Sequence, residues 1–215
     1  MGRYGRYVGK VYAKFLPNGR DMQLLKPFKY IDPHKKVWPA PARSIVDGAS
    51  IPQFAWSIIG GPFEGKYREA SVIHDVACDK KNRPWAAVHE MFYYAMRASG
   101  VGSVKAKIMY AAVHYFGPRW YTKAELNAAL RRMLVGPVGR RPLLETGARM
   151  RSPKYKLAKY PLAGAPLAPP PPPPAPPGLT PANFKELQQF ITDREKATKN
   201  QLSLAEIRDF RPAEQ

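Results

Sequence analysis

A proline tract at residues 161–177 limits what this chain can fold into more than any other part of its sequence. Proline has no backbone N–H and its ring fixes φ, so the tract can join neither a helix interior nor a central strand. We expect it to form an extended polyproline II rod, about 3.1 Å long per residue, that acts as a spacer. The tract therefore separates a long N-terminal part of the chain from a short C-terminal part.

The composition on either side of the tract predicts four segments. Residues 1–121 have the mixed pattern of a compact domain, and residues 122–160 form a basic arm rich in Lys and Arg. Residues 161–179 are the proline-rich linker, and residues 180–215 are expected to form C-terminal docking helices. With 45% apolar residues over 215 positions, the chain has enough apolar content to bury a core.

The charge and the cysteine content limit the classes of protein that fit. A formal net charge of +19 predicts attraction to polyanions, which are nucleic acid, an anionic membrane surface or an acidic protein. The single cysteine, Cys78, excludes an internal disulfide framework and fits a reducing compartment or an assembled particle. The first residues lack the apolar core of a signal peptide, and we expect no transmembrane segment.

The pattern of the first half predicts an α+β fold. Aromatic and β-branched residues between turn-forming residues predict a small antiparallel sheet. Its strands are expected at residues 7–15, 22–25, 28–31 and 37–38. Helical spacing of apolar residues then predicts a three-helix unit. Its helices are expected at residues 65–79, from Pro84 to before Gly100, and from Ser103 to Gly117-Pro118.

The C-terminal part is predicted to end in helices that bind a surface. A short helix is expected at residues 122–134, and Thr180-Pro181 suits the start of a further helix. Its apolar residues fall along one side, at Phe184, Leu187, Phe190 and Ile191. A capping-box sequence, 203–206, opens a last short turn. Such a stripe must dock on something, either this domain or another chain.

The dipeptide His74-Asp75 is the sharpest indication of chemistry. Adjacent residues on a helix point about 100° apart, so the two side chains must serve different partners. One interpretation is a His that activates water beside an Asp that holds a divalent cation such as calcium. The alternative is a core His bonded to the backbone, with Asp75 capping the helix or bridging to Arg68 or Lys81.

Two neighbouring features favour a functional interpretation. A turn containing Gly60, Gly61 and Gly65 precedes the helix, and its carbonyl groups could complete an oxygen shell around calcium. On the next helix, His89 and Glu90 could face His74. We therefore expect His74, His89 and Glu90 to be the catalytic residues, and Asp75 with the three glycines to bind the metal.

A long series of spaced residues points to a family. Its members are Asp47-Gly48-Ala49-Ser50-Ile51-Pro52, Trp56, Gly65, Tyr67, Ala70, His74-Asp75, Phe92, Met96, Gly100-Val101, Tyr110, Val113, Gly117 and Trp120. This order, over residues 7–121, resembles a domain of unknown function common in tailed phages and prophages. The resemblance implies a phage-encoded protein and leaves its biochemistry open.

A second resemblance is to bacterial phospholipase A2. It implies that His74 is the general base, that Asp75 binds calcium, and that carbonyls around Gly60 to Gly65 supply further ligands. Calcium would polarise the ester carbonyl while His74 deprotonates the attacking water. The chain departs from that pattern at two positions, because His89 stands where an orienting Asp is needed and Cys78 where a Tyr is usual.

A zinc site made of His74, Asp75, His89 and Cys78 is a further alternative. Cys78 lies one helical turn after His74, which is a workable spacing for two ligands. The sequence matches no recognised zinc-binding spacing and buried cysteines are common, so packing roles are the preferred interpretation. His34 and His114 are expected to be ordinary surface or core residues.

These observations lead to one principal prediction and two alternatives. The chain is predicted to be a structural component of a tailed-phage virion, part of an oligomeric assembly, that contacts other virion proteins through residues 122–215. It would be found in the virion, or in the host cytoplasm before assembly. The alternatives are a calcium-dependent phospholipase A2-like hydrolase and a protein that binds nucleic acid through the basic arm.

Overall fold

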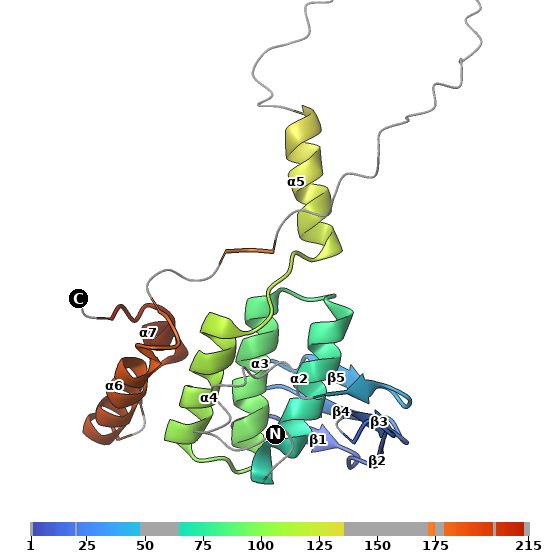
Figure 1. Ribbon diagram of the computed structural model, residues 1–215, viewed down its shortest axis with the longest axis horizontal. Helices are drawn as coiled ribbons and strands as arrows, with labels where there is room; N and C mark the ends of the chain where they lie inside the picture. Colours follow the sequence, from blue (N-terminus) through green and yellow to red (C-terminus); the bar gives the residue numbers. More distant parts are fainter. Residues whose placement is uncertain are drawn as a thin grey trace, which may run out of the picture. The chain divides into compact units, whose positions relative to one another are not determined.

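The computed structural model describes residues 2–19, 21–47, 65–135, 172–174, 179–199 and 201–212 (Figure 1). The chain divides into two compact units. The first contains residues 1–122 together with 173–215, and the second contains residues 123–172. Most of the expected proline rod and most of the basic arm lie outside the described residues.

Two small antiparallel sheets form the N-terminal part of the first unit. One has the order β1-β4-β5 and consists of β1 (Arg6–Val8), β4 (Phe28–Ile31) and β5 (Val37–Ala40). The other has the order β2-β3-β6 and consists of β2 (Ala13–Phe15), β3 (Met22–Leu24) and β6 (Ile45–Val46). The register pairs Tyr30 with Tyr7 on one side and with Trp38 on the other. The α+β class is confirmed.

The expectation of a single sheet is wrong. Residues 7–15, predicted as one strand, split into β1 and β2 around Gly9, which has a φ of 88°. This left-handed conformation suits glycine and interrupts an extended strand. The chain therefore leaves the first sheet after β1 and enters the second at β2.

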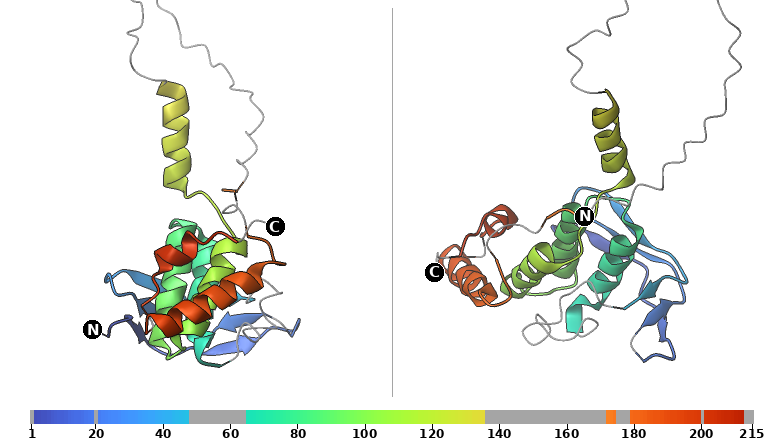
Figure 2. Two further views of the ribbon diagram at one scale, coloured as in Figure 1. Left: turned by 90° about the vertical axis from the view of Figure 1, so that its left-hand side faces the viewer. Right: turned by 45° about the horizontal axis from the view of Figure 1, so that its top comes forward.

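Three helices follow the strands along the chain. The segment begins with a short 3-10 turn, η1 (Gly65–Tyr67), and continues as α2 (Arg68–Lys80), α3 (Trp85–Ala98) and α4 (Ser103–Phe116). These bounds agree with the predicted helices to within a turn. Helix α2 lies between the strands and α3, and α3 lies between α2 and α4 (Figures 1 and 2).

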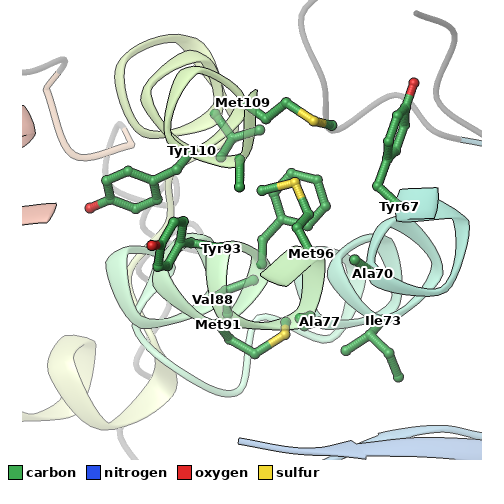
Figure 3. Close-up of a cluster of buried hydrophobic side chains, with 14 of the residues drawn as sticks. Tyr67, Ala70, Ile73, Ala77, Val88, Met91, Tyr93, Met96, Met109 and Tyr110 are labelled. Carbon is green, nitrogen blue, oxygen red and sulfur yellow. The ribbon is translucent and has the colours of Figure 1, made fainter. Parts of the chain in front are cut away.

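The apolar core fills the space between these helices and continues toward the strands. In Figure 3, side chains of α2, α3 and α4 meet at its centre. The residues labelled there from these helices are Ala70, Ile73, Ala77, Val88, Met91, Tyr93, Met96, Met109 and Tyr110. A hydrogen bond from the Tyr7 hydroxyl to the carbonyl oxygen of Ala95, at 2.9 Å, ties β1 to α3. Because α2 is covered on both sides, every residue from Ala70 to Cys78 is buried.

Helices α6 (Phe184–Ala197) and α7 (Leu204–Arg208) belong to the same unit and pack on α4. Phe184, Leu187 and Ile191 of α6 and Ile207 of α7 are buried. The predicted helix start at Thr180-Pro181 is wrong. Residues 181–183 form a turn in which the Thr180 backbone N–H donates to the Asn183 side chain at 2.6 Å, and the helix begins at Phe184.

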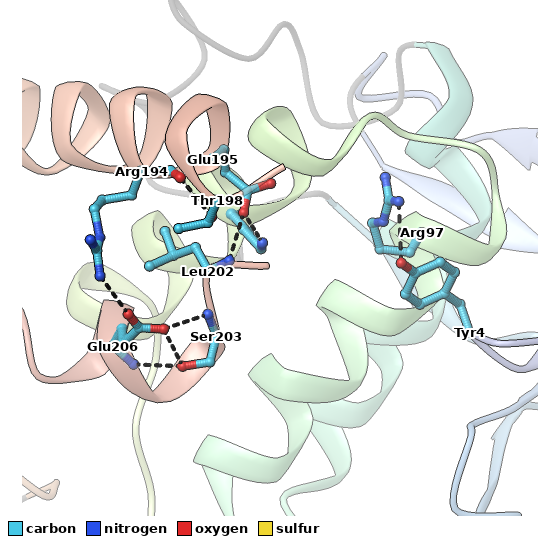
Figure 4. A network of polar contacts seen from close by, with 9 residues as sticks. Tyr4, Arg97, Arg194, Glu195, Thr198, Leu202, Ser203 and Glu206 are labelled. Carbon is cyan, nitrogen blue, oxygen red and sulfur yellow. Dashed lines mark hydrogen bonds and ion pairs between the residues drawn. The ribbon is translucent and has the colours of Figure 1, made fainter. Parts of the chain in front are cut away.

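Polar contacts strengthen this docking (Figure 4). The Lys107 ammonium of α4 forms a buried ion pair with Glu195 of α6, whose carboxylate also accepts a 3.1 Å hydrogen bond from the backbone N–H of Leu202. The hydroxyl of Tyr115 donates to the carbonyl oxygen of Ile207 at 2.9 Å. The predicted capping box between Ser203 and Glu206 is present. The sequence left open whether the C-terminal helices dock on this domain or on another chain. In the structure they dock on helix α4 of the same chain.

The second unit contains α5 (Lys123–Val135), which confirms the helix expected at residues 122–134. None of the described helices combines the length and the apolar character needed to cross a membrane.

Candidate functional site

His74 lies on the face of α2 that packs against α3. Its side chain is buried, and its ring stacks on Phe92 with 4.5 Å between the ring centroids. Phe92 comes from α3, so the imidazole sits at the contact between the two helices. This position gives His74 no direct access to solvent.

The polar partners of His74 among the described residues are His89 and Cys78. The Nε2 atom of His74 lies 2.8 Å from Nδ1 of His89, and the Sγ atom of Cys78 lies 3.6 Å from the same Nε2. Cys78 reaches His74 because residues four apart on a helix share a face. The ligand atoms of the three buried side chains all lie within 4.8 Å of one another. We call this group the His-Cys-His cluster.

A backbone carbonyl orients His89. The Nε2 atom of His89 lies 3.2 Å from the carbonyl oxygen of Pro118, which can only accept a hydrogen bond. The proton of a neutral His89 is therefore on Nε2, and its Nδ1 presents a lone pair toward His74. His74 then donates from Nε2, so hydrogen bonds run from His74 through His89 to the backbone.

The surroundings keep both imidazoles neutral. Burial lowers the pKa of His74 to about 3. Burial, reinforced by His74 and His114, holds the pKa of His89 well below its usual value. Neutral imidazoles with such low pKa values are weak bases, whereas the mechanism implied by the phospholipase resemblance needs a carboxylate to stabilise the imidazolium. Among the described residues, His74 has no carboxylate partner.

Asp75 faces a different environment from His74, as expected from their positions on the helix. It lines a cavity of about 670 Å³, where further acidic side chains are present. The acidic residues of the lining are Asp21, Asp47, Asp75 and Asp79, and Arg43 and Lys81 supply positive charge. Cys78 and Pro118 also line this cavity, so the His-Cys-His cluster adjoins it.

Among the described residues, the predicted site residues Gly65 and Glu90 do not join the cluster. Gly60 and Gly61 lie outside the described residues. Gly65 begins η1 with a φ of 63°, a conformation that suits glycine. Glu90 forms an ion pair with Arg208 at 3.5 Å and lines another pocket, of about 200 Å³, beside Trp38. The structure therefore brings together His74 and His89, while Glu90 faces elsewhere.

Two contributors to the site were not predicted from the sequence. Phe92 stacks on His74, and the carbonyl of Pro118 orients His89. The spacing of Phe92, three residues after His89, gave a signal for the first, because such residues share a helix face. The Pro118 carbonyl follows the end of α4, and nothing in the sequence pattern places it near α3.

The segment that carries the His-Cys-His cluster has relatives. Residues 22–113 match a family described as "Protein of unknown function (DUF1353)". The DUF1353 match begins at β3 and ends within α4, so it contains all three residues of the cluster. No solved structure matches the chain.

Two curated proteins of Sinorhizobium fredii (strain NBRC 101917 / NGR234) are similar to the chain. The uncharacterized protein y4jT is 55% identical over 98 residues, which are 46% of this chain and 29% of y4jT. The uncharacterized protein y4iH is 42% identical over 115 residues, which are 53% of this chain and 48% of y4iH. The chain thus spans less than half the length of either relative.

Proposed function

We propose that this chain is a structural component of a tailed-phage particle, in which residues 123–172 contact neighbouring proteins. The observation that carries the proposal is the docking of α6 and α7 on α4. In the sequence, residues 123–172 are inserted between two parts of the first unit, and we call this inserted segment the loop. The resemblance of residues 7–121 to a phage and prophage family supports the setting.

The packing of α6 on α4 is stabilised by buried apolar side chains. Phe184, Leu187 and Ile191 bury their side chains, and each such burial contributes about 1.5–3 kcal/mol. Separating α6 from α4 would also expose or isolate the buried charges of Lys107 and Glu195. The docking of α6 on α4 therefore keeps the residues that follow 123–172 in the first unit.

The charge of the loop indicates the kind of surface it meets. Residues 123–172 contain ten Lys or Arg residues and only two acidic residues. Such a segment is attracted to acidic protein surfaces and to nucleic acid. Nucleic-acid binding by this loop is therefore the second candidate function, favoured by the same charge.

The geometry of His74 offers less support for a hydrolase. His74 is only 1% exposed and its polar partners are His89 and Cys78. A general base must reach the proton of its water and be stabilised once protonated. A structural role needs neither condition.

The test replaces residues 123–172 by a flexible Gly/Ser linker in the phage or prophage that encodes the chain. We expect the variant to keep its unfolding temperature and to be lost from particles purified on a density gradient and assayed by mass spectrometry. A matched variant keeps the loop and changes its ten Lys and Arg residues to Gln. It isolates the contribution of charge.

The outcomes separate the candidate functions. Absence of the wild-type chain from purified particles, or full incorporation of the linker variant, would contradict the structural proposal. Retention of DNA by the wild-type protein that falls steeply with salt, and disappears in the Gln variant, would favour nucleic-acid binding.

A further inference from the structure

We propose that His74, Cys78 and His89 form a binding site for a divalent transition-metal ion, with Zn²⁺ as the natural occupant. This site is independent of the role of the loop. It rests on three buried side chains whose ligand atoms converge within 4.8 Å. Imidazole nitrogen and thiolate sulfur are the ligands that Zn²⁺ prefers in proteins.

The backbone holds the three ligands on rigid elements. His74 and Cys78 occupy successive turns of α2, and His89 comes from the adjacent helix α3. The two helices are packed together through the apolar core on both sides of the site. Sites built on packed helices fix ligand positions better than sites on loops. An ion here would cross-link α2 to α3.

One of the distances between ligand atoms matches tetrahedral coordination, and a second is shorter. With Zn–N of about 2.0–2.1 Å and Zn–S of about 2.3 Å, tetrahedral angles separate sulfur from nitrogen by about 3.6 Å and two nitrogens by about 3.4 Å. The Sγ of Cys78 lies 3.6 Å from Nε2 of His74, which matches the first separation. The two imidazole nitrogens are 2.8 Å apart, which is a hydrogen-bond distance. They would have to move apart by roughly half an ångström when the ion replaces the shared proton.

The backbone contact of His89 is the kind that metal-binding histidines make. A ligating imidazole usually donates its other N–H to a carbonyl or carboxylate, which fixes the tautomer and the ring orientation. The Nε2 of His89 makes this contact with Pro118, and Nδ1 is left to bind the ion. His74 binds through Nε2 with its proton on Nδ1, so both rings stay neutral.

The proton balance of binding is simple. The Cys78 thiol loses its proton and becomes the thiolate ligand, and the proton of His74 moves from Nε2 to Nδ1. One proton is released to solvent for each ion bound. The Cys78 side chain also lines the 670 Å³ cavity, so a water molecule from the cavity can fill the remaining coordination position.

The donor set selects among metals. Calcium and magnesium take oxygen ligands, whereas two imidazoles and a thiolate favour zinc, cobalt or copper. The calcium expected from the phospholipase resemblance is therefore not the ion that this cluster would take. The two positions at which the chain departs from that pattern, His89 and Cys78, are the polar side chains that contact His74 among the described residues.

The experiment uses the full-length protein without a histidine tag. Metal content is measured after dialysis against equimolar Zn²⁺, and Co²⁺ titration is followed by absorption in the visible and near ultraviolet. We expect one ion per chain and a thiolate-to-cobalt charge-transfer band. Because Cys78 is the only cysteine, this band would identify its sulfur as a ligand.

Variants locate the site. Cys78→Ser and His89→Gln are expected to lose the bound ion, and Cys78→Ser to lose the charge-transfer band. His34→Gln is the matched control, because His34 lies at the other pocket beside Trp38. It should bind one ion with the wild-type spectrum.

The proposal is overturned if the folded wild-type protein takes up neither ion, or if cobalt binds without the thiolate band. It is also overturned if Cys78→Ser and His89→Gln bind as the wild type does, since the ion would then sit elsewhere. If circular dichroism shows that a variant fails to fold, the cobalt spectrum of the wild-type protein decides alone.

Discussion

His114 is a buried histidine outside the cluster, and its environment sets its charge. It packs against the rings of Trp85 and Tyr110, and its Nδ1 has no hydrogen-bond partner among the described residues. Burial, together with the positive charges of Arg208 and Arg119, lowers its pKa to about 4. Folding therefore keeps this side chain neutral in mildly acidic solution.

The low pKa of His114 predicts a pH-dependent loss of stability. In the unfolded chain a histidine has a pKa of about 6.5, so between pH 6.5 and 4 the unfolded state binds the additional proton and stability falls as pH falls. His114→Phe should remove this term, so that from pH 7 to 4.5 the variant loses about 2 kcal/mol less than the wild type. Urea unfolding at both pH values measures the difference, and carboxylates common to both proteins cancel. Equal losses in the two proteins would contradict the assignment.

At the level of residues, the sequence predicted which way a side chain points from its helix better than it predicted which residue that side chain contacts. The divergence of His74 and Asp75 follows from helix geometry and is observed, since one joins the cluster and the other lines the cavity. The choice between His89 and Glu90 did not follow, because it depends on the rotation of α3 against α2. That rotation is set by burial of Val88 and Phe92, which brings His89 inward.

Helices α4 and α6 are joined by the buried pair of Lys107 and Glu195. Lys107→Met should destabilise the protein by about 3–5 kcal/mol, because the carboxylate of Glu195 is then buried without its cation. Adding Glu195→Gln removes that charge and keeps an acceptor for the backbone N–H of Leu202. The double variant should be more stable than Lys107→Met in chemical unfolding. A double variant that loses the sum of the two single effects would show that the charges are not coupled.

The division into two sheets depends on Gly9. Its φ of 88° lies in a region that side chains with a Cβ rarely adopt, while the space around it is open enough for a methyl group, with Phe28 Cβ at 3.4 Å. Gly9→Ala should therefore destabilise by about 1 kcal/mol or more through backbone strain. Gly9→Val should be worse and Gly9→Asn milder, because Asn tolerates positive φ. Thermal unfolding of the three variants gives the order, and equal effects would contradict it.

Element prediction succeeded where local signals were strong. The capping box at Ser203 and the helical periodicities of α2, α3 and α4 are local properties of the sequence, and the structure reproduces them. The strand at residues 7–15 failed because a single glycine conformation overrides a run of residues that favour strands. Helix α6 begins at Phe184, later than predicted, because the Asn183 side chain accepts a hydrogen bond from Thr180 and stabilises a turn before the helix.

At the scale of the molecule, the first unit is formed by residues on both sides of the segment 123–172. A chain that stops at residue 179 should unfold at lower temperature and bind a hydrophobic dye, because α4 would expose the surface now covered by Leu187 and Ile191. The same truncation would leave Lys107 without Glu195. Replacing residues 123–172 by a Gly/Ser linker is the control, and should change stability by less than about 1 kcal/mol. Equal stability of the truncated and full-length chains would contradict this account.

The sequence left this whole-molecule arrangement undecided for a physical reason. An amphipathic helix predicts that a partner surface exists and says nothing about which surface it is. Which surface the helix packs on depends on the complementary face of α4. That face includes Lys107, whose burial no local sequence pattern predicts. Contacts between residues almost ninety positions apart, such as Lys107 and Glu195, determine where the helix packs, and helical periodicity does not report such contacts.

The pairing of Lys107 with Glu195 has a consequence for inheritance. Lys107 falls inside the segment shared with the DUF1353 family, while Glu195 falls outside it. A relative that kept the lysine without the C-terminal helix would expose this ammonium to solvent and would lack the carboxylate that pairs with it. Homologues that have the later helix should therefore carry opposite charges at positions 107 and 195, whereas homologues that lack it should vary freely at position 107.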